Sequence, residues 1–190
     1  MTDPLNPKNF NRSDSELEEW LLFCIFVAGK NSKTQQKKLH EFLDLLGYPE
    51  YPIKLLSDFS EALIGVYLRE VKMGQYNRLT KCLHTLSHAN LDLRTCTTEQ
   101  LESIPGIGMK TSRFFITYSR ETNDYAVLDT HILSWMRENG YDAPLSTPTN
   151  PKQYKELERL FLEECKKRNM TPQELDFNIW ESRQTSWSIN

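Results

Sequence analysis

The chain has 190 residues, a formal net charge of −3, and 38% hydrophobic and 26% charged residues, close to the values of ordinary globular proteins. This composition excludes wholesale disorder, and the chain is long enough to bury a core without disulfides. No apolar run approaches the ~18 residues of a membrane span, and the N-terminal segment lacks the features of a secretory signal. We therefore expect a soluble, intracellular, monomeric protein.

The charges are unevenly distributed. Residues 13–20 carry four acids and no base, whereas residues 30–40 carry four lysines and no acid. Either run alone fits a solvated helix face, and the negative net charge by itself argues against a nucleic-acid partner. The lysine-rich run nevertheless leaves an anionic partner open.

The cysteines and histidines do not form a recognisable metal motif. The four cysteines lie far apart without a Cys-x-x-Cys pair, so we expect reduced, mostly buried thiols. His84 and His88 share one predicted helix face, but no third ligand is placed near them. A zinc site is therefore rejected.

Helical periodicity runs along the whole chain, and no convincing two-residue alternation of a strand is present. After an irregular arm, Ser13 and Glu16 form a capping box that begins an apolar helix ending near Gly29. The predicted fold is all-α, with about eight to ten helices. Further helices are predicted at 32–47, 57–71, 75–89, 151–170 and 171–184.

Two short helices are predicted to meet in a hairpin. Thr97 begins the first helix through a capping box, and Pro105 stops it. Gly106 and Gly108 permit the positive backbone dihedrals of a tight reversal before a second helix at 109–119. Amides at such a reversal lack intrahelical partners, so the hairpin can bind a phosphate. A Gly-x-Gly pair alone is weak evidence, because glycines also end helices for structural reasons.

Two residues near this hairpin have the chemistry of a catalytic pair. Lys110 lies in the first turn of the second helix, where the positive end of the helix dipole favours the neutral amine that a nucleophile requires. Asp129 follows the apolar run YAVL and is the predicted N-cap of the next helix. Capping and catalysis are compatible roles for this carboxylate.

The segment IPGIGMKTS, followed by LDTHIL, resembles the signature of the helix-hairpin-helix (HhH-GPD) DNA glycosylase superfamily. Lys110, two residues after the second glycine, matches the family's catalytic lysine, and Asp129 matches its catalytic aspartate. His131 matches the histidine that follows this aspartate. The resemblance covers about residues 13–145, and LDFNIWESRQ near the C-terminus resembles the small type-2 8-oxoguanine DNA glycosylase/AP lyases.

The resemblance implies two helical lobes, a central one of about 30–130 with the hairpin at 97–120, and a second one made of 1–29 and 131–190. It implies a base-excision-repair enzyme that flips a damaged base, with 8-oxoguanine favoured, out of double-stranded DNA. Lys110 would attack C1′ and form a Schiff base, Asp129 would stabilise the cationic sugar, and β-elimination would cut the strand. No metal or organic cofactor is required.

The resemblance also implies residues that contact DNA. The expected contacts to the DNA backbone are Gly106, Gly108, Thr111, Lys30, Lys33 and Arg113. Asn31 and Gln35 lie where a side chain could insert into the duplex, although Asn31 could equally cap the next helix. Phe177, Trp180 and Trp187 could stack on a flipped base, with core packing as the alternative for each.

Two other functions remain open. One is a glycosylase for another altered base, such as an oxidised pyrimidine or a hypermodified base. The type-2 enzymes share a terminal lysine that helps to recognise the oxidised purine, whereas this chain ends in Asn190. The other is a non-enzymatic DNA-binding module, in which Lys110→Gln would leave every function intact.

Overall fold

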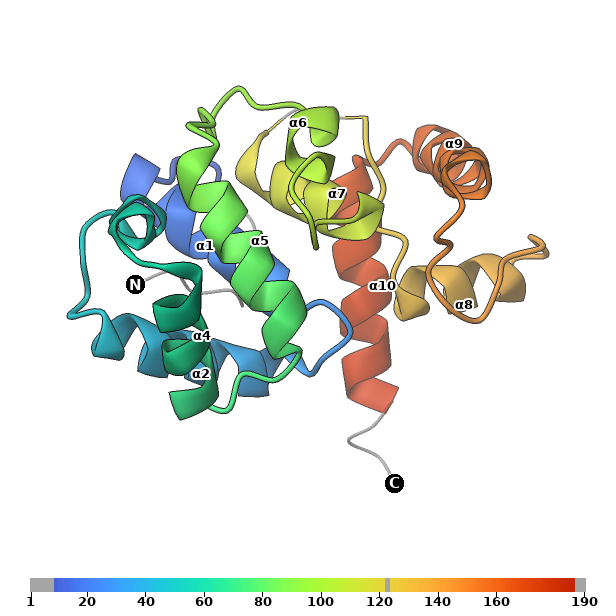
Figure 1. Cartoon of the computed structure of the whole chain (residues 1–190). Coiled ribbons are helices and arrows are strands. Elements are labelled where there is room, and N and C mark those ends of the chain that lie inside the picture. The colour runs from blue at the N-terminus through green and yellow to red at the C-terminus, as the bar shows by residue number, and fades with distance from the viewer. Residues whose placement is uncertain (1–8, 122–123, 187–190) are drawn as a thin grey trace.

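The computed structural model describes residues 9–121 and 124–186, and in these ranges all regular structure is helical (Figure 1). The all-α prediction is confirmed. No helix in the described ranges combines the length and apolar character needed to cross a lipid bilayer. The elements are α1 (Asp14–Phe26), α2 (Ser32–Leu45), α3 (Pro52–Leu55), the 3-10 helix η1 (Leu56–Asp58), α4 (Glu61–Glu70), α5 (Tyr76–His88), α6 (Thr98–Glu102), α7 (Met109–Ser119), α8 (Thr130–Glu138), α9 (Pro151–Lys167) and α10 (Pro172–Ser186).

Buried apolar side chains form two clusters. The larger cluster contains side chains of α1 to α7, and the smaller one those of α8, α9 and α10. In Figure 1, α10 (red) lies between the helices of the larger cluster and the pair α8 and α9. The clusters are the cores of two lobes.

The position of α1 differs from the sequence prediction, which placed residues 1–29 with residues 131–190. The helix contributes its side chains to the larger cluster and contacts α2, α3 and α7. All side chains from Trp20 to Phe26 are buried. A helix that is apolar all round has to be covered on every side, and the larger lobe provides that cover.

A short non-helical segment, residues 126–128, joins the two lobes and leads directly into α8. Ala126 and Leu128 belong to the smaller cluster and Val127 to the larger one, so successive side chains of this segment enter opposite lobes. Side chains of other elements form hydrogen bonds with the backbone groups of this segment. The Tyr154 hydroxyl donates to the Ala126 carbonyl at 2.9 Å and accepts the Leu128 amide at 3.2 Å, and Thr147 Oγ1 donates to the Leu128 carbonyl at 2.8 Å.

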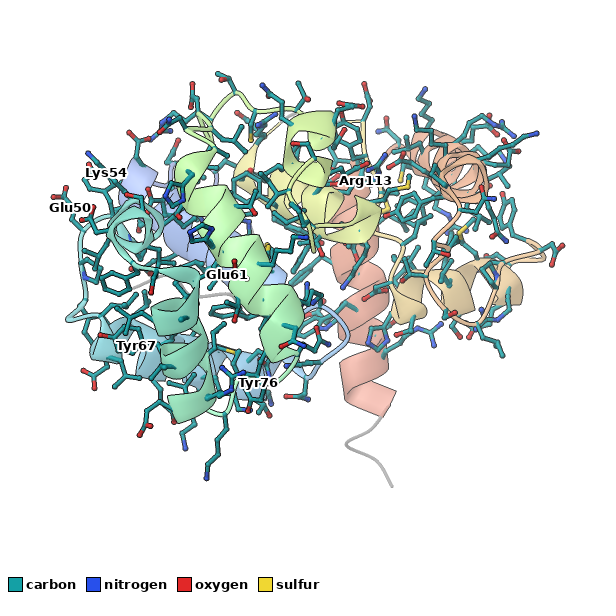
Figure 2. All side chains as sticks on the ribbon, viewed as in Figure 1. Glu50, Lys54, Glu61, Tyr67, Tyr76 and Arg113 are labelled. Atoms are coloured by element: carbon teal, nitrogen blue, oxygen red, sulfur yellow. The ribbon has the colours of Figure 1, made fainter. Side chains whose placement is uncertain are left out.

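A buried ion pair reinforces this junction. Arg113 of α7, labelled in Figure 2, donates from Nε to Glu158 Oε1 of α9 at 2.8 Å and from Nη1 to Glu102 of α6. Its guanidinium carbon lies 4.9 Å from the centre of the Tyr154 ring. Glu158 also accepts the Ala126 amide at 3.0 Å. The network therefore connects α6, α7 and α9 with the segment that precedes α8.

The substitution Arg113→Leu is expected to lower the free energy of unfolding by about 3–5 kcal/mol, because Glu158 would stay buried without its cation. Urea denaturation measures this loss. As a control, Arg159→Leu removes exposed ion pairs on α9 and should leave the unfolding free energy close to that of the wild type. Similar losses in the two variants would contradict the structural role of Arg113.

Candidate active site

A cleft of about 610 Å³ lies where the two lobes meet. Lys110, at the start of α7 in the larger lobe, and Asp129, which begins α8 in the smaller lobe, both line it. The structure therefore brings together two residues that are 19 positions apart in the sequence. Six aromatic side chains line the same cleft: Trp20, Phe23, Phe114, Tyr118, Phe177 and Trp180.

Lys110 occupies the first turn of α7, as the sequence predicts, because α7 begins at Met109. The side chain is partly buried, and Nζ lies 5.5 Å from the centre of the Phe114 ring, one helical turn further along. The N-cap Gly108 provides no side-chain hydrogen bond to α7. The amine thus lies on an aromatic surface at the positive end of a helix.

Asp129 is the N-cap of α8, which confirms that prediction. Its Oδ1 accepts the amides of His131 at 2.8 Å and Ile132 at 2.9 Å. These two bonds fix the orientation of the carboxylate and use only one of its oxygens. The Tyr154 and Thr147 contacts with residues 126–128 hold the backbone that immediately precedes it.

Asp176 and Tyr118 complete the polar part of the cleft, and the sequence does not predict them. Tyr118 donates its hydroxyl to Asp176 Oδ2 at 2.7 Å. Burial and the nearby charge of Asp129 raise the pKa of Asp176 to about 7, although the Tyr118 hydrogen bond and the charge of Lys110 lower it. The spacing on α10 was an available signal, because Asp176 precedes Trp180 by four residues and so shares a helix face with it.

The burial of Tyr118 keeps its hydroxyl neutral. Burial and the neighbouring Asp176 raise the pKa of Tyr118 well above its ordinary value. The hydroxyl therefore remains a donor to the Asp176 carboxyl over the pH range in which that carboxyl titrates.

The two hairpin glycines have different roles. Gly106 has a φ of +94°, and a Cβ there would lie 3.1 Å from Cγ of Arg78 and 3.2 Å from Cβ of Cys82. Its carbonyl accepts a hydrogen bond from Arg78 Nη1 at 2.7 Å. Gly108 has a φ of −101°, so the prediction of a positive dihedral is wrong there, and a Cβ would meet nothing within 4 Å. The tight reversal requires glycine at position 106. At position 108, glycine places no side chain over the amides at the start of α7.

Three of the residues predicted to contact the DNA backbone are buried or hydrogen-bonded within the protein. Arg113 is 2% exposed and paired with two carboxylates, so its predicted phosphate contact is wrong. The Thr111 side chain is also buried, which leaves only its amide for a phosphate. Lys30 lines the cleft but donates from Nζ to the Met73 carbonyl. Lys33, by contrast, is exposed.

The two residues predicted to insert into a duplex have different environments. Asn31 is exposed at the cleft and is also the N-cap of α2, since its side chain accepts the Thr34 amide at 3.1 Å. Gln35 is 3% exposed on the buried face of α2. The prediction for Gln35 is therefore wrong, because a buried side chain cannot reach DNA.

Phe177 and Trp180 line the cleft and are only partly buried, with ring centres 6.1 Å apart. They are therefore placed where a flat aromatic ligand could contact them. Trp187 and Asn190 lie outside the described residues. The four cysteines are buried free thiols, as predicted, and no described group of three or more His, Cys, Asp or Glu side chains is arranged for a metal ion.

Two helical lobes, a glycine hairpin and a cleft containing a lysine and an aspartate define the helix-hairpin-helix DNA glycosylase class. A family model described as 8-oxoguanine DNA glycosylase, of the helix-hairpin-helix type, matches residues 5–170. The chain belongs to this family.

Individual relatives agree with this assignment. An 8-oxoguanine DNA glycosylase/AP lyase of Picrophilus torridus is 35% identical over 80 residues, which cover 42% of this chain and 37% of that protein. The match thus spans well under half of the relative's length.

The fold is similar to that of the 8-oxoguanine glycosylase/lyase of Methanocaldococcus jannaschii, crystallised with a 15mer DNA containing 8-oxoguanine. That comparison has a TM-score of 0.71 and 21% identity, and covers 95% of this chain and 87% of the other.

The fold is also similar to that of the 8-oxoguanine DNA glycosylase of Thermotoga maritima. The TM-score is 0.69 at 18% identity, and the similarity covers 93% of this chain and 86% of that chain. Both structural similarities therefore extend over the two lobes.

The two glycines of the hairpin should respond differently to alanine. Gly106→Ala is expected to lower the free energy of unfolding by about 1–3 kcal/mol, because alanine is strained at a positive φ. Gly108→Ala should keep a melting temperature near that of the wild type but bind duplex DNA more weakly, since a methyl group would separate the phosphate from the amides. Thermal unfolding and fluorescence anisotropy measure the two effects. Unchanged DNA affinity of Gly108→Ala would exclude the phosphate site.

Asp176 should make the stability of the protein depend on pH. Its pKa rises from 3.8 to about 7 on folding, so only the unfolded chain loses this proton between these values, and the free energy of unfolding falls as pH rises. Asp176→Asn cannot ionise and should melt above the wild type at pH 8, by about 2–4 °C for each kcal/mol regained. Calorimetry at pH 4 should show little difference. A lower melting temperature of Asp176→Asn at pH 8 would refute the raised pKa.

Proposed function

We propose that this protein is a base-excision-repair DNA glycosylase with β-lyase activity, which removes an oxidised base, 8-oxoguanine by preference, from double-stranded DNA. The observation that carries the proposal is the presence of Lys110 and Asp129 in one aromatic cleft between the lobes. Membership of the 8-oxoguanine DNA glycosylase family supports the substrate class. The enzyme acts as a monomer in the compartment that holds the DNA.

The target nucleotide leaves the base stack before reaction, because the sugar carbon C1′ cannot be attacked within the duplex. The aromatic lining of the cleft favours a flat base, which could stack on Phe177 and Trp180. The unprotonated amine of Lys110 then attacks C1′ as the base departs.

Asp129 stabilises the positive charge that develops on the sugar during this attack. The Oδ1 atom is held by two amides of α8, so the carboxylate does not have to reorient as the charge appears. Electrostatic preorganisation of this kind is most effective in a cleft that excludes water.

The covalent adduct opens to a Schiff base between Lys110 and the sugar, and β-elimination from this intermediate cuts the strand on the 3′ side of the lesion. Neither step needs a metal or an organic cofactor. The lyase activity therefore depends on the same amine as base removal, and both should be lost together.

The DNA backbone is held outside the cleft. The amides at the start of α7, around Gly108, form the phosphate site, because no side chain caps that helix. Exposed Lys33 supplies a further phosphate contact, and Asn31 lies at the cleft where it could occupy the space left in the duplex. These contacts place the flipped nucleotide over Lys110.

The experiment is borohydride trapping of the wild type and of Lys110→Gln on duplexes containing 8-oxoguanine, oxidised pyrimidines, uracil or an abasic site. The wild type is expected to form a covalent adduct, most of it with 8-oxoguanine among the base-containing duplexes. Lys110→Gln should form none while binding DNA, because it lacks the amine. Lys152→Gln, an exposed lysine on α9, is the matched control and should be trapped like the wild type.

Each part of the proposal has its own contrary outcome. The absence of an adduct on every duplex, including the abasic one, would refute the lyase. Stronger trapping on an oxidised pyrimidine than on 8-oxoguanine would be consistent with the mechanism but would contradict the proposed substrate. Unchanged cleavage by Lys110→Gln would exclude this lysine as the nucleophile.

A further inference from the structure

We propose that Asp176 is the general acid that protonates the departing base, while Asp129 remains the ionised carboxylate beside the sugar. This inference rests on the proposed glycosylase function and adds to it a second acidic residue with a different role. The two carboxyl groups reach the cleft from different helices, α10 and the start of α8.

The position of Asp176 is the first argument. It lines the cleft together with Lys110 and Asp129 and lies on the same helix as Phe177 and Trp180, whose rings also line the cleft. Asp176 is adjacent to one of these aromatic residues and one helical turn from the other. A base that contacts those rings therefore lies on the α10 side of the cleft, next to this carboxyl.

The hydrogen bonding of Asp176 is the second argument. Tyr118 donates to Oδ2 at 2.7 Å, so this oxygen is already an acceptor. The transferable proton is then carried by Oδ1. Because Tyr118 belongs to α7, the bond also holds the carboxyl of α10 against the helix that carries Lys110. Tyr118 thus positions the Asp176 carboxyl without accepting its proton.

The electrostatic surroundings favour the protonated form. Burial and the charge of Asp129 raise the pKa of Asp176, whereas the hydrogen bond from Tyr118 and the charge of Lys110 lower it. The raising effects are larger, and the pKa is about 7. A carboxyl group whose pKa is raised in this way can act as a proton donor near neutral pH. The titratable groups around Asp176 are Lys110 and Tyr118 from α7, Asp129 and His131 at the start of α8, Cys165 from α9, and Lys30 at the cleft.

Groups in the cleft account for every proton and electron pair of this step. When the Lys110 amine bonds to C1′, the bond from C1′ to the base breaks and its electron pair leaves with the base. The Asp176 proton passes to this base, which departs neutral, and Asp176 becomes a carboxylate. The Lys110 nitrogen, now positively charged, releases a proton that restores the Asp176 carboxyl. No outside oxidant or reductant is needed.

Asp176→Asn tests the proposal, because asparagine keeps the shape and an acceptor for Tyr118 but has no acidic proton. Single-turnover excision of 8-oxoguanine is expected to fall by about 10²-fold or more, the usual range for a lost general acid. Trapping on an abasic duplex should stay near the wild-type level, since no base departs there. Glu181→Gln, the same charge change on α10 outside the cleft, should leave both activities unchanged.

The pH dependence of excision provides a readout that a structural role would not move. A general acid must be protonated, so wild-type excision should decline as pH rises above about 7. This decline should be absent in Asp176→Asn. Tyr118→Phe removes the hydrogen bond that lowers the pKa of Asp176, so it should move the decline to higher pH. Tyr118→Phe also keeps the proposal testable if Asp176→Asn does not fold.

A series of 8-substituted purines provides a further comparison. Bases that leave easily need less protonation, so the deficit of Asp176→Asn should shrink as the leaving ability increases. A deficit of equal size for every base, or wild-type excision by Asp176→Asn, would overturn the acid role. Failure of the wild type itself to be trapped on the abasic duplex would instead overturn the proposed lyase, so the two failures are distinguishable.

Discussion

The hydrogen bonds from Tyr154 to residues 126–128 are the interaction on which the rest of the site depends. This segment is the link between the two cores, and no strand among residues 9–121 and 124–186 pairs with its backbone groups. An unpaired buried amide or carbonyl is costly, so the side chains of α9 must approach closely. Docking α9 on the segment brings Glu158 to Arg113 of α7, and thereby fixes the distance between the helices that carry Lys110 and Asp129.

The cleft brings together charged groups and helix ends that a single lobe could not easily position. Lys110 lies at the start of one helix and Asp129 caps the start of another, so two positive helix ends approach a site that also holds a negative carboxylate. Asp176 adds a carboxyl whose pKa burial raises to about 7, so at neutral pH it carries less negative charge than an exposed carboxylate. The boundary between lobes permits this arrangement, because each group is supported by its own core.

Local features of the fold follow closely from the sequence. Capping residues such as Ser13, Thr97 and Asp129 begin helices where their short side chains predict. The motif around Lys110 predicts that this residue and Asp129 share a site, and both line the cleft. Tertiary features could not be predicted in this way. Periodicity assigns a buried arginine such as Arg113 to a polar face, because its carboxylate partners are distant in sequence. Asp176 likewise gains its properties only when α10 packs against α7 and α8.

The alternation of residues 126–128 between the two lobes makes both cores depend on the length of this segment. Ala126 and Leu128 enter the smaller core, and Val127 enters the larger one. The Asp129 amide donates to the Val127 carbonyl at 2.7 Å, which makes a tight turn directly before α8. One residue inserted before Val127 would therefore exchange side chains between the cores and shift the turn that sets the direction of the Asp129 carboxylate.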